Sequence, residues 1–153
     1  MRDIFNEVNI MLHMIVEQTY KYPMRMEYNP DTGAFTESEY QSLQYVRNFT
    51  KPYGWIKESG TPPVSHWDCI LMTDREYELG DEVEIKIIGV FKRLDFDHKY
   101  VVAESTREID DISELLESER EEVSRLYPRV SDGEGWFGKD VANQLYLGTQ
   151  RSR

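Results

Sequence analysis

Residues 95–99, Asp-Phe-Asp-His-Lys, place two carboxylates, an imidazole and an ammonium group side by side. Carboxylate oxygens are preferred ligands of hard divalent cations such as Mg²⁺, and a lysine beside them suits a phosphate oxygen. If the segment is extended, residues two apart point to the same side, so Asp95, Asp97 and Lys99 share one face. The alternative interpretation is a solvated hairpin tip of mixed charge, because charge clusters are common at turns.

Two strands are predicted to flank this segment and to position it. Before it, Val83, Ile85 and Ile87 alternate with charged residues, which is the period of a half-buried strand. After it, residues 100–103 form an apolar run. Residues 82–104 therefore predict a β-hairpin whose turn carries the charged groups.

The N-terminal part predicts a short helix followed by strands. Apolar residues at helical spacing predict a helix over residues 3–12. Residues 14–19, which include Glu17, have a β-like pattern. Residues 24–28 alternate so that Arg25 and Glu27 share one face, for which a surface ion pair of little energetic value is the alternative explanation.

The middle of the chain contains turns and one buried strand. Asn29-Pro30-Asp31-Thr32-Gly33 is a strong turn signal, after which a second strand completes a hairpin. Residues 51–55 form an aromatic-rich corner and residues 58–63 a loop. Asp68 opens an apolar strand at residues 69–72, where it either ends the strand or holds a metal ion.

From Asp110 the pattern changes to helix. Asp111 and Glu114 have the spacing of a capping box, and an apolar stripe continues to residue 127, before Pro128. A second helix is predicted from about Lys139, with frayed residues from 148 onward. Many strands followed by two helices predict an α+β fold with a β-barrel.

Composition narrows the possible functions. With 153 residues, the chain has the length of a single domain, residues 1–153. A net charge of −11 argues against nucleic-acid and anionic-membrane surfaces, although bound metal ions can still attract anionic substrates. Cys69 is the only cysteine, and no signal peptide or membrane-spanning run is seen. We therefore expect a cytoplasmic protein.

Taken together, these segments resemble the soluble family I inorganic pyrophosphatases over about residues 16–147. The resemblance is carried by the order and spacing of several short motifs: Met26-Glu27-Tyr28, Asp31-Thr32-Gly33-Ala34-Phe35, Pro52-Tyr53-Gly54-Trp55-Ile56, Asp68-Cys69-Ile70-Leu71, Ile88-Gly89-Val90-Phe91, Asp97-His98-Lys99 and Gly135-Trp136. It implies a small OB-like β-barrel with two C-terminal helices. It also implies a homo-oligomer, since bacterial members commonly form hexamers.

The resemblance also assigns roles to individual residues. It implies that carboxylates hold Mg²⁺, with Mn²⁺ as an alternative, at Glu17, Asp68, Asp95 and Asp97. It implies catalytic roles for Glu27, Asp68 and Tyr53, and phosphate binding by Arg25, Lys99, Tyr53 and Tyr127. The expected reaction is Mg²⁺-dependent hydrolysis of pyrophosphate or a related phosphoanhydride, because clustered Mg²⁺ activates water and neutralises phosphate charge.

The sequence departs from the family at several of these positions. The family segment Asp-Gly-Asp-Pro-x-Asp stands here as Pro63-Val64-Ser65-His66-Trp67-Asp68, which retains only the last aspartate. Glu39 replaces an expected arginine, and Pro128 an expected lysine. His66 is either a substitute ligand or a structural histidine, and the sequence favours the second interpretation.

Three hypotheses follow from these observations. The first is a metal-dependent pyrophosphatase, supported by the carboxylates and cations that remain. The second is a catalytically impaired or inactive relative that serves as a binding or assembly module, supported by the loss of carboxylates before Asp68. The third, an oligonucleotide-binding barrel, is disfavoured by the negative charge and the lack of a basic aromatic groove.

Overall fold

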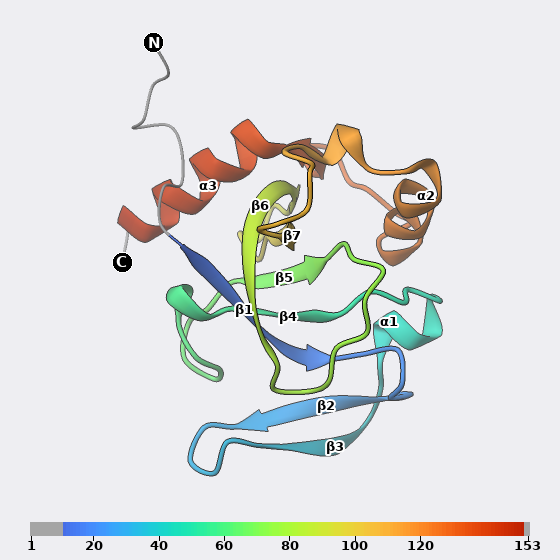
Figure 1. Cartoon of the computed structure of the whole chain (residues 1–153), viewed down its shortest axis with the longest axis vertical. Coiled ribbons are helices and arrows are strands. Elements are labelled where there is room, and N and C mark those ends of the chain that lie inside the picture. Colours follow the sequence, from blue (N-terminus) through green and yellow to red (C-terminus); the bar gives the residue numbers. More distant parts are fainter. Residues whose placement is uncertain (1–10, 152–153) are drawn as a thin grey trace.

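A closed five-stranded β-barrel forms the centre of the molecule (Figure 1). The computed structural model describes residues 11–151. The barrel strands pair in the order β1-β4-β5-β7-β6, and β6 pairs with β1 to close the ring. All neighbours are antiparallel except β5 and β7, which run parallel. The strands are Leu12–Gln18 (β1), Tyr53–Ile56 (β4), Asp68–Leu71 (β5), Glu82–Lys92 (β6) and Lys99–Glu104 (β7).

The remaining elements surround this barrel. A sixth strand, β8 (Gly135–Gly138), pairs antiparallel with the end of β6, while β2 (Met24–Asn29) and β3 (Ala34–Gln41) form a separate hairpin. Helix α3 (Lys139–Arg151) and helix α2 (Glu117–Leu126) lie on the same end of the barrel in Figure 1, away from the hairpin. The short pieces are the helical turn α1 (Leu43–Val46) and the 3₁₀ turns η2 (Lys57–Ser59) and η3 (Ile112–Glu114).

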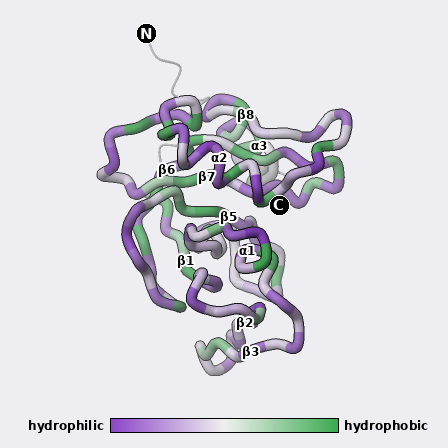
Figure 2. Tube along the Cα trace, turned by 90° about the vertical axis from the view of Figure 1, so that its right-hand side faces the viewer, coloured by the Kyte–Doolittle hydropathy of each residue, from purple (hydrophilic) through white to green (hydrophobic). Residues whose placement is uncertain are grey.

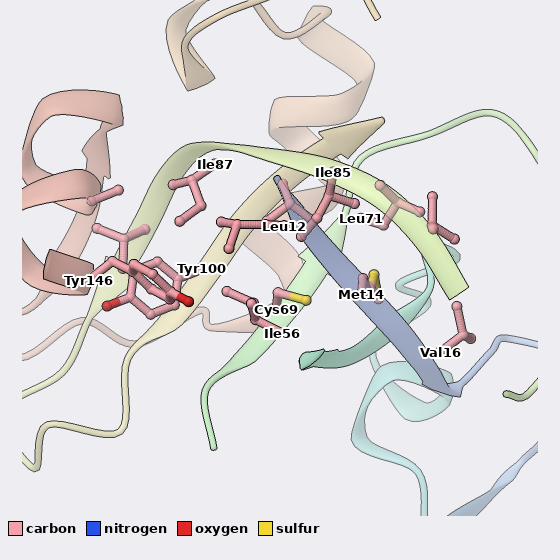
Figure 3. Packing of buried hydrophobic residues seen from close by; sticks show 14 residues of the cluster. Leu12, Met14, Val16, Ile56, Cys69, Leu71, Ile85, Ile87, Tyr100 and Tyr146 are labelled. Carbon is pink, nitrogen blue, oxygen red and sulfur yellow. The ribbon is translucent and has the colours of Figure 1, made fainter. Parts of the chain in front are cut away.

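The core consists of two apolar clusters that share the central strands. The first joins alternate residues of the barrel strands to Ala142 and Tyr146 of α3, as Figure 3 shows. The second lies on the opposite side of β5 and β7 and includes Val123 and Leu126 of α2. Because β7 is buried on both faces, it is continuously apolar rather than alternating, and Figure 2 shows β5 and β7 as hydrophobic along much of their length.

The predicted α+β fold, a small β-barrel with two C-terminal helices, is confirmed. Two short strands, β4 and β8, were expected as a corner and a loop. Of the helix predicted over residues 3–12, residues 3–10 lie outside the described part of the chain, and Leu12 begins β1 instead. The residues expected to fray from 148 continue α3 to Arg151.

The helix predicted from Asp110 begins later than expected. Asp111 caps the 3₁₀ turn η3, where its carboxylate accepts the Ser113 amide. Helix α2 starts only at Glu117, and Glu119 accepts the amide of Leu116 there. The capping signal was therefore real but belonged to a separate turn, because a short polar motif does not specify how far the helix continues.

The β6–β7 connection differs from the extended segment considered for residues 95–99. It is a tight turn in which Phe96 has a φ of 65°, and the Phe96 amide donates to the carbonyl oxygen of Arg93 over 3.3 Å. His98 is buried, and its Nδ1 accepts the Arg93 amide over 2.9 Å. The hairpin prediction is confirmed, but side-chain alternation does not extend through the turn.

Candidate active site

Asp68 and Lys99 open the two parallel strands of the barrel and lie opposite each other. They are register partners in the β5–β7 pair, so their side chains emerge at the same edge. Lys99 Nζ donates to Asp68 Oδ2 over 2.8 Å and to Asp97 Oδ2 over 3.1 Å. An ammonium group has three N–H donors, so one remains that no described residue uses.

Tyr53, at the start of β4, donates its hydroxyl to Asp68 Oδ2 over 2.7 Å. The following residue, Gly54, faces the backbone of Ile15 in β1 so closely that a Cβ atom there would collide with the Ile15 carbonyl oxygen. Glycine therefore permits the close approach of β4 to β1. That approach brings Tyr53 beside the end of β1, where Glu17 lies.

Glu17 occupies a β-bulge. The β1–β4 register changes between Val16 and Gln18, which leaves Glu17 as the extra residue. Burial and the nearby charge of Asp68 raise the pKa of the Glu17 carboxyl to about 7, while His66, Arg25 and Lys99 oppose the rise. The Glu17 carboxyl is thus influenced by several nearby charges, and no hydrogen bond to its side chain is found among residues 11–151.

His66 lies between Asp68 and the backbone of its own loop. Its Nε2 is 3.2 Å from Asp68 Oδ1 and its Nδ1 is 2.7 Å from the Val64 carbonyl oxygen. The contact with Asp68 raises the pKa of His66, although burial opposes it. The sequence favoured a structural histidine over a substitute ligand. The structure places the His66 imidazole beside Asp68, a neighbour that a single histidine in the sequence does not reveal.

Three groups around Asp68 keep its carboxyl ionised. Burial raises the pKa of the Asp68 carboxyl, but His66, Lys99 and Tyr53 lower it more, to about 2. Burial lowers the pKa of Lys99, and the charge of Asp68 outweighs that effect and raises it. Burial and the Asp68 charge raise the pKa of Tyr53. Asp68 and Lys99 therefore form a buried ion pair at neutral pH.

The predicted phosphate-binding residues Arg25 and Tyr127 lie around this group. Arg25 is exposed on β2, and its charge reaches Glu17. Gln18 ties this hairpin to the barrel, since its amide side chain accepts the Met26 N–H over 2.9 Å. Tyr127 is half-buried and stacks on Phe91 with ring centres 4.5 Å apart.

Two carboxylates that were predicted for the site, Asp95 and Glu27, make no hydrogen bond or ion pair with Asp68 among residues 11–151. Asp95 accepts the Asp97 amide over 3.0 Å and lies 3.6 Å from Arg93, so it shapes the β6–β7 turn. Glu27 is exposed on β2, and no hydrogen bond or ion pair links it to Asp68 in the described part of the chain. Their assigned metal and catalytic roles remain predictions.

Comparisons with known proteins agree on the fold. Neither a protein-family model nor a curated protein matches the sequence. An inorganic pyrophosphatase from Neisseria gonorrhoeae superposes with a TM-score of 0.70 and 18% identity over 92% of this chain and 90% of the other. The chain has the inorganic pyrophosphatase fold.

Other pyrophosphatase structures give the same result. The enzyme from Ehrlichia chaffeensis has a TM-score of 0.68 and 18% identity, covering 93% of this chain and 94% of its own. The enzyme from Thermus thermophilus has a TM-score of 0.62 and 17% identity, covering 91% and 89%. Such low identities fit a divergent pyrophosphatase fold and confirm the resemblance at that level. None of the helices in the described part of the chain is long and apolar enough to cross a membrane.

The side chains of this pyrophosphatase fold do not form a closed metal cage. Among residues 11–151, no three His, Cys, Asp or Glu side chains converge as a metal-binding group. Asp68 Oδ2 accepts hydrogen bonds from Tyr53 and Lys99, whereas the buried Oδ1 has no hydrogen bond from any described residue and faces His66 Nε2 at 3.2 Å. Glu17 lies close enough to Asp68 for the two charges to repel. Mg²⁺ is commonly bound by one or two carboxylates together with substrate phosphates. Asp68 fits that arrangement, a single cation shared with a substrate.

Proposed function

We propose that this protein binds pyrophosphate or a related phosphoanhydride at the Asp68 group and hydrolyses it with the help of Mg²⁺. The observation that carries this proposal is the convergence of Tyr53, His66 and Lys99 on Asp68, beside Glu17, whose pKa is raised by burial and by the charge of Asp68. The pyrophosphatase fold supports it, because the same barrel is found in enzymes described as inorganic pyrophosphatases.

The chain's own residues supply binding and proton transfer. The free N–H of Lys99 and the guanidinium group of Arg25 are suited to phosphate oxygens, since phosphoryl transfer needs mainly positioning and charge neutralisation. Arginine also offers a planar fork of donors that matches phosphate. Tyr127, on the adjacent loop, would contribute a further hydroxyl.

Glu17 is suited to act as the general base. With a pKa of about 7, it is partly ionised near neutral pH and can accept a proton from water. Water then attacks one phosphorus as Glu17 takes its proton, the bridging P–O bond breaks with its electron pair on the leaving phosphate, and Glu17 returns the proton to that phosphate. When bound by Asp68 and the substrate phosphates, Mg²⁺ would neutralise phosphate charge and lower the pKa of water, which leaves Glu17 to take the proton.

A second candidate function is binding without hydrolysis. It is favoured by the charges around Asp68, because a carboxylate already neutralised by Lys99 and His66 attracts a cation less strongly. In this case the site would hold a phosphate-containing anion and turn it over slowly or not at all. The predicted oligomer could then serve as an assembly module.

Phosphate release from pyrophosphate, with Mg²⁺ and then Mn²⁺, tests the proposal. Lys99→Gln should reduce release on the order of 100-fold or more, because it removes a buried cation from the reacting charges. Lys57→Gln is the matched control, since Lys57 pairs with Glu82 over 2.7 Å at an exposed site.

Phosphate release in the two variants distinguishes hydrolysis at this site from binding alone. Release that is lost in the Lys99 variant but retained in the control would support hydrolysis at this site. A folded wild-type protein that releases no phosphate with either metal, yet binds pyrophosphate calorimetrically, would favour the binding function instead.

A further inference from the structure

The loops that carry the candidate active site also expose large apolar side chains. Val64 is 69% exposed, Leu94 58%, Phe96 73% and Val130 51%. All four lie within a few residues of a group assigned to the site. We call them the apolar rim. Other exposed apolar side chains are found elsewhere on the chain, but these four belong to the loops that carry the site.

The contacts of the rim residues tie them to the site. Leu94 packs against Gly133, because a Cβ atom added to Gly133 would be 3.0 Å from Leu94 Cδ2. The Leu94 amide donates to the Glu134 carboxylate over 3.0 Å. The β6–β7 turn and the loop after Tyr127 therefore touch, and Val130 belongs to that loop. On the other loop, the Val64 carbonyl oxygen holds the imidazole of His66.

Phe96 is held in a conformation that its side chain does not favour. Its φ of 65° lies in the left-handed region, where Gly, Asn or Asp is usual and a bulky residue is strained. Strain of this kind persists only where the surroundings impose it, and here they are the hydrogen bonds that close the turn at Arg93 and Asp97. Because the ring is exposed, burial in the core does not compensate for the strain.

The charges inside the site are mixed, which favours one kind of substrate over another. The cations Arg25, His66 and Lys99 face the carboxylates Glu17 and Asp68. A bare pyrophosphate is small and highly charged, so it gains nothing from an apolar rim. A phosphoanhydride that carries an organic group has less charge to neutralise, and its ring can stack on an exposed aromatic side chain.

We propose that the substrate is a nucleoside polyphosphate, whose phosphates bind at Lys99 and whose base packs on Phe96 and the rest of the apolar rim. This inference rests on the proposed function, since it places the phosphoanhydride at the same Asp68 group. The rim selects the organic group, and the buried charges hold the phosphates.

Calorimetric titration with two non-hydrolysable ligands tests the inference. Adenosine α,β-methylene diphosphate serves as the nucleotide probe, and methylenediphosphonate as the pyrophosphate probe, both with Mg²⁺. The wild-type protein should bind the nucleotide probe more tightly. In Phe96→Asn, affinity for the nucleotide probe should fall about tenfold or more relative to methylenediphosphonate, because stacking is lost.

The variants are chosen so that unfolding cannot imitate the result. Asparagine accepts the left-handed conformation better than phenylalanine, so Phe96→Asn should be at least as stable as the wild type. Leu116→Asn is the control, because Leu116 is 64% exposed and precedes α2, where asparagine is a good cap. The affinity ratio in that variant should equal the wild-type ratio.

Three results would overturn the inference. If the wild type prefers methylenediphosphonate and Phe96→Asn leaves the ratio unchanged, the nucleotide assignment fails while the proposed function stands. An equal loss of both ligands in Phe96→Asn would show that the turn acts on phosphate alone. If neither ligand binds the folded protein, the proposed function fails as well.

Discussion

The two ends of the parallel β5–β7 pair carry charged groups in different states. At the first end, Asp68 and Lys99 form a buried pair, and the pKa of Glu17 beside them is raised by burial and by the charge of Asp68. Beyond the other end, Thr73 and Tyr77 donate hydroxyls to Glu104 over 2.7 and 2.9 Å. These partners satisfy the Glu104 carboxylate.

A second ion pair completes the far end. Arg107 donates two N–H groups to Glu119, over 2.6 and 2.9 Å, and one to the Met72 carbonyl oxygen. Burial raises the pKa of Glu119, but the Arg107 bond lowers it overall. These residues border a cavity of about 470 Å³, and they join α2 to the barrel.

The difference separates charges that stabilise the fold from charges for which we propose a chemical role. At the far end, the ionised form of Glu119 is favoured by its partner, so that pair contributes to stability. At the first end, Glu17 is held where ionisation is costly, with a pKa of about 7. Perturbed groups of this second kind are typical of active sites. Substitutions at the two ends should therefore affect different properties.

Asp68→Asn should have the largest effect. Removing this carboxylate takes the charge partner from Lys99, which is 7% exposed, so phosphate release should fall on the order of 100-fold or more. The unfolding free energy should fall by roughly 3 kcal/mol, because a buried charge loses its counter-ion. Release assays and urea titration measure both effects. Asp110→Asn, at an exposed pair with Lys86, is the control, and equal activity loss there would contradict the assignment.

Glu119→Gln should change stability and leave catalysis intact. The substitution leaves Arg107 partly buried without its counter-ion, which should lower the unfolding free energy by about 2 to 4 kcal/mol. Glutamine can still accept the Leu116 amide, so the start of α2 is preserved. Glu121→Gln, at an exposed pair with Arg125, should cost at most about 0.5 kcal/mol. A large loss of activity per folded molecule in Glu119→Gln would break the distinction between the two ends.

Glu17 should make stability decrease as pH rises. Its folded pKa of about 7 exceeds the ordinary 4.5, so the folded state binds the proton more tightly. The stabilisation is complete below pH 4.5 and is lost as pH rises to about 7, by roughly 1 to 3 kcal/mol. Urea unfolding at pH 5 and pH 8 should show this loss in the wild type and a smaller one in Glu17→Gln. Identical losses in both proteins would mean that Glu17 titrates normally.

The smallest effects come from a matched pair of hydroxyl deletions. Tyr53→Phe and Tyr77→Phe each remove a hydroxyl donor from a carboxylate, Asp68 or Glu104. Each should cost about 1 kcal/mol of unfolding free energy. Only Tyr53→Phe should also reduce phosphate release, by up to about tenfold, as measured in the same assay. A similar activity loss in Tyr77→Phe would show that the two ends are coupled.

Much of the fold could be predicted because its patterns are local. The alternation of Val83, Ile85 and Ile87 identified β6, and the apolar run after Lys99 identified β7. Strand β8, Gly135–Gly138, was missed because its glycines and aromatic residues read as a loop, and it forms only by pairing with β6. Short strands of this kind are determined by their neighbours.

The sequence indicated which residues lie together at the candidate site better than it indicated how they are arranged. Asp68, Lys99 and Tyr53 were expected together, and the structure joins them by hydrogen bonds. The bulge at Glu17 depends on the β1–β4 register, which the sequence does not display. The pairing of His66 with Asp68 likewise depends on the path of a loop.

The closure of the barrel also affects how the chain must fold. Leu12 of β1 pairs with Ile85 of β6, so the first strand finds one of its two neighbours only late in the sequence. Contacts between distant residues form slowly because a long loop must be closed first. During synthesis, one edge of β1 has no strand to pair with until β6 has left the ribosome. An exposed strand edge invites pairing with other chains, so a product truncated before β6 should aggregate rather than accumulate as a folded fragment.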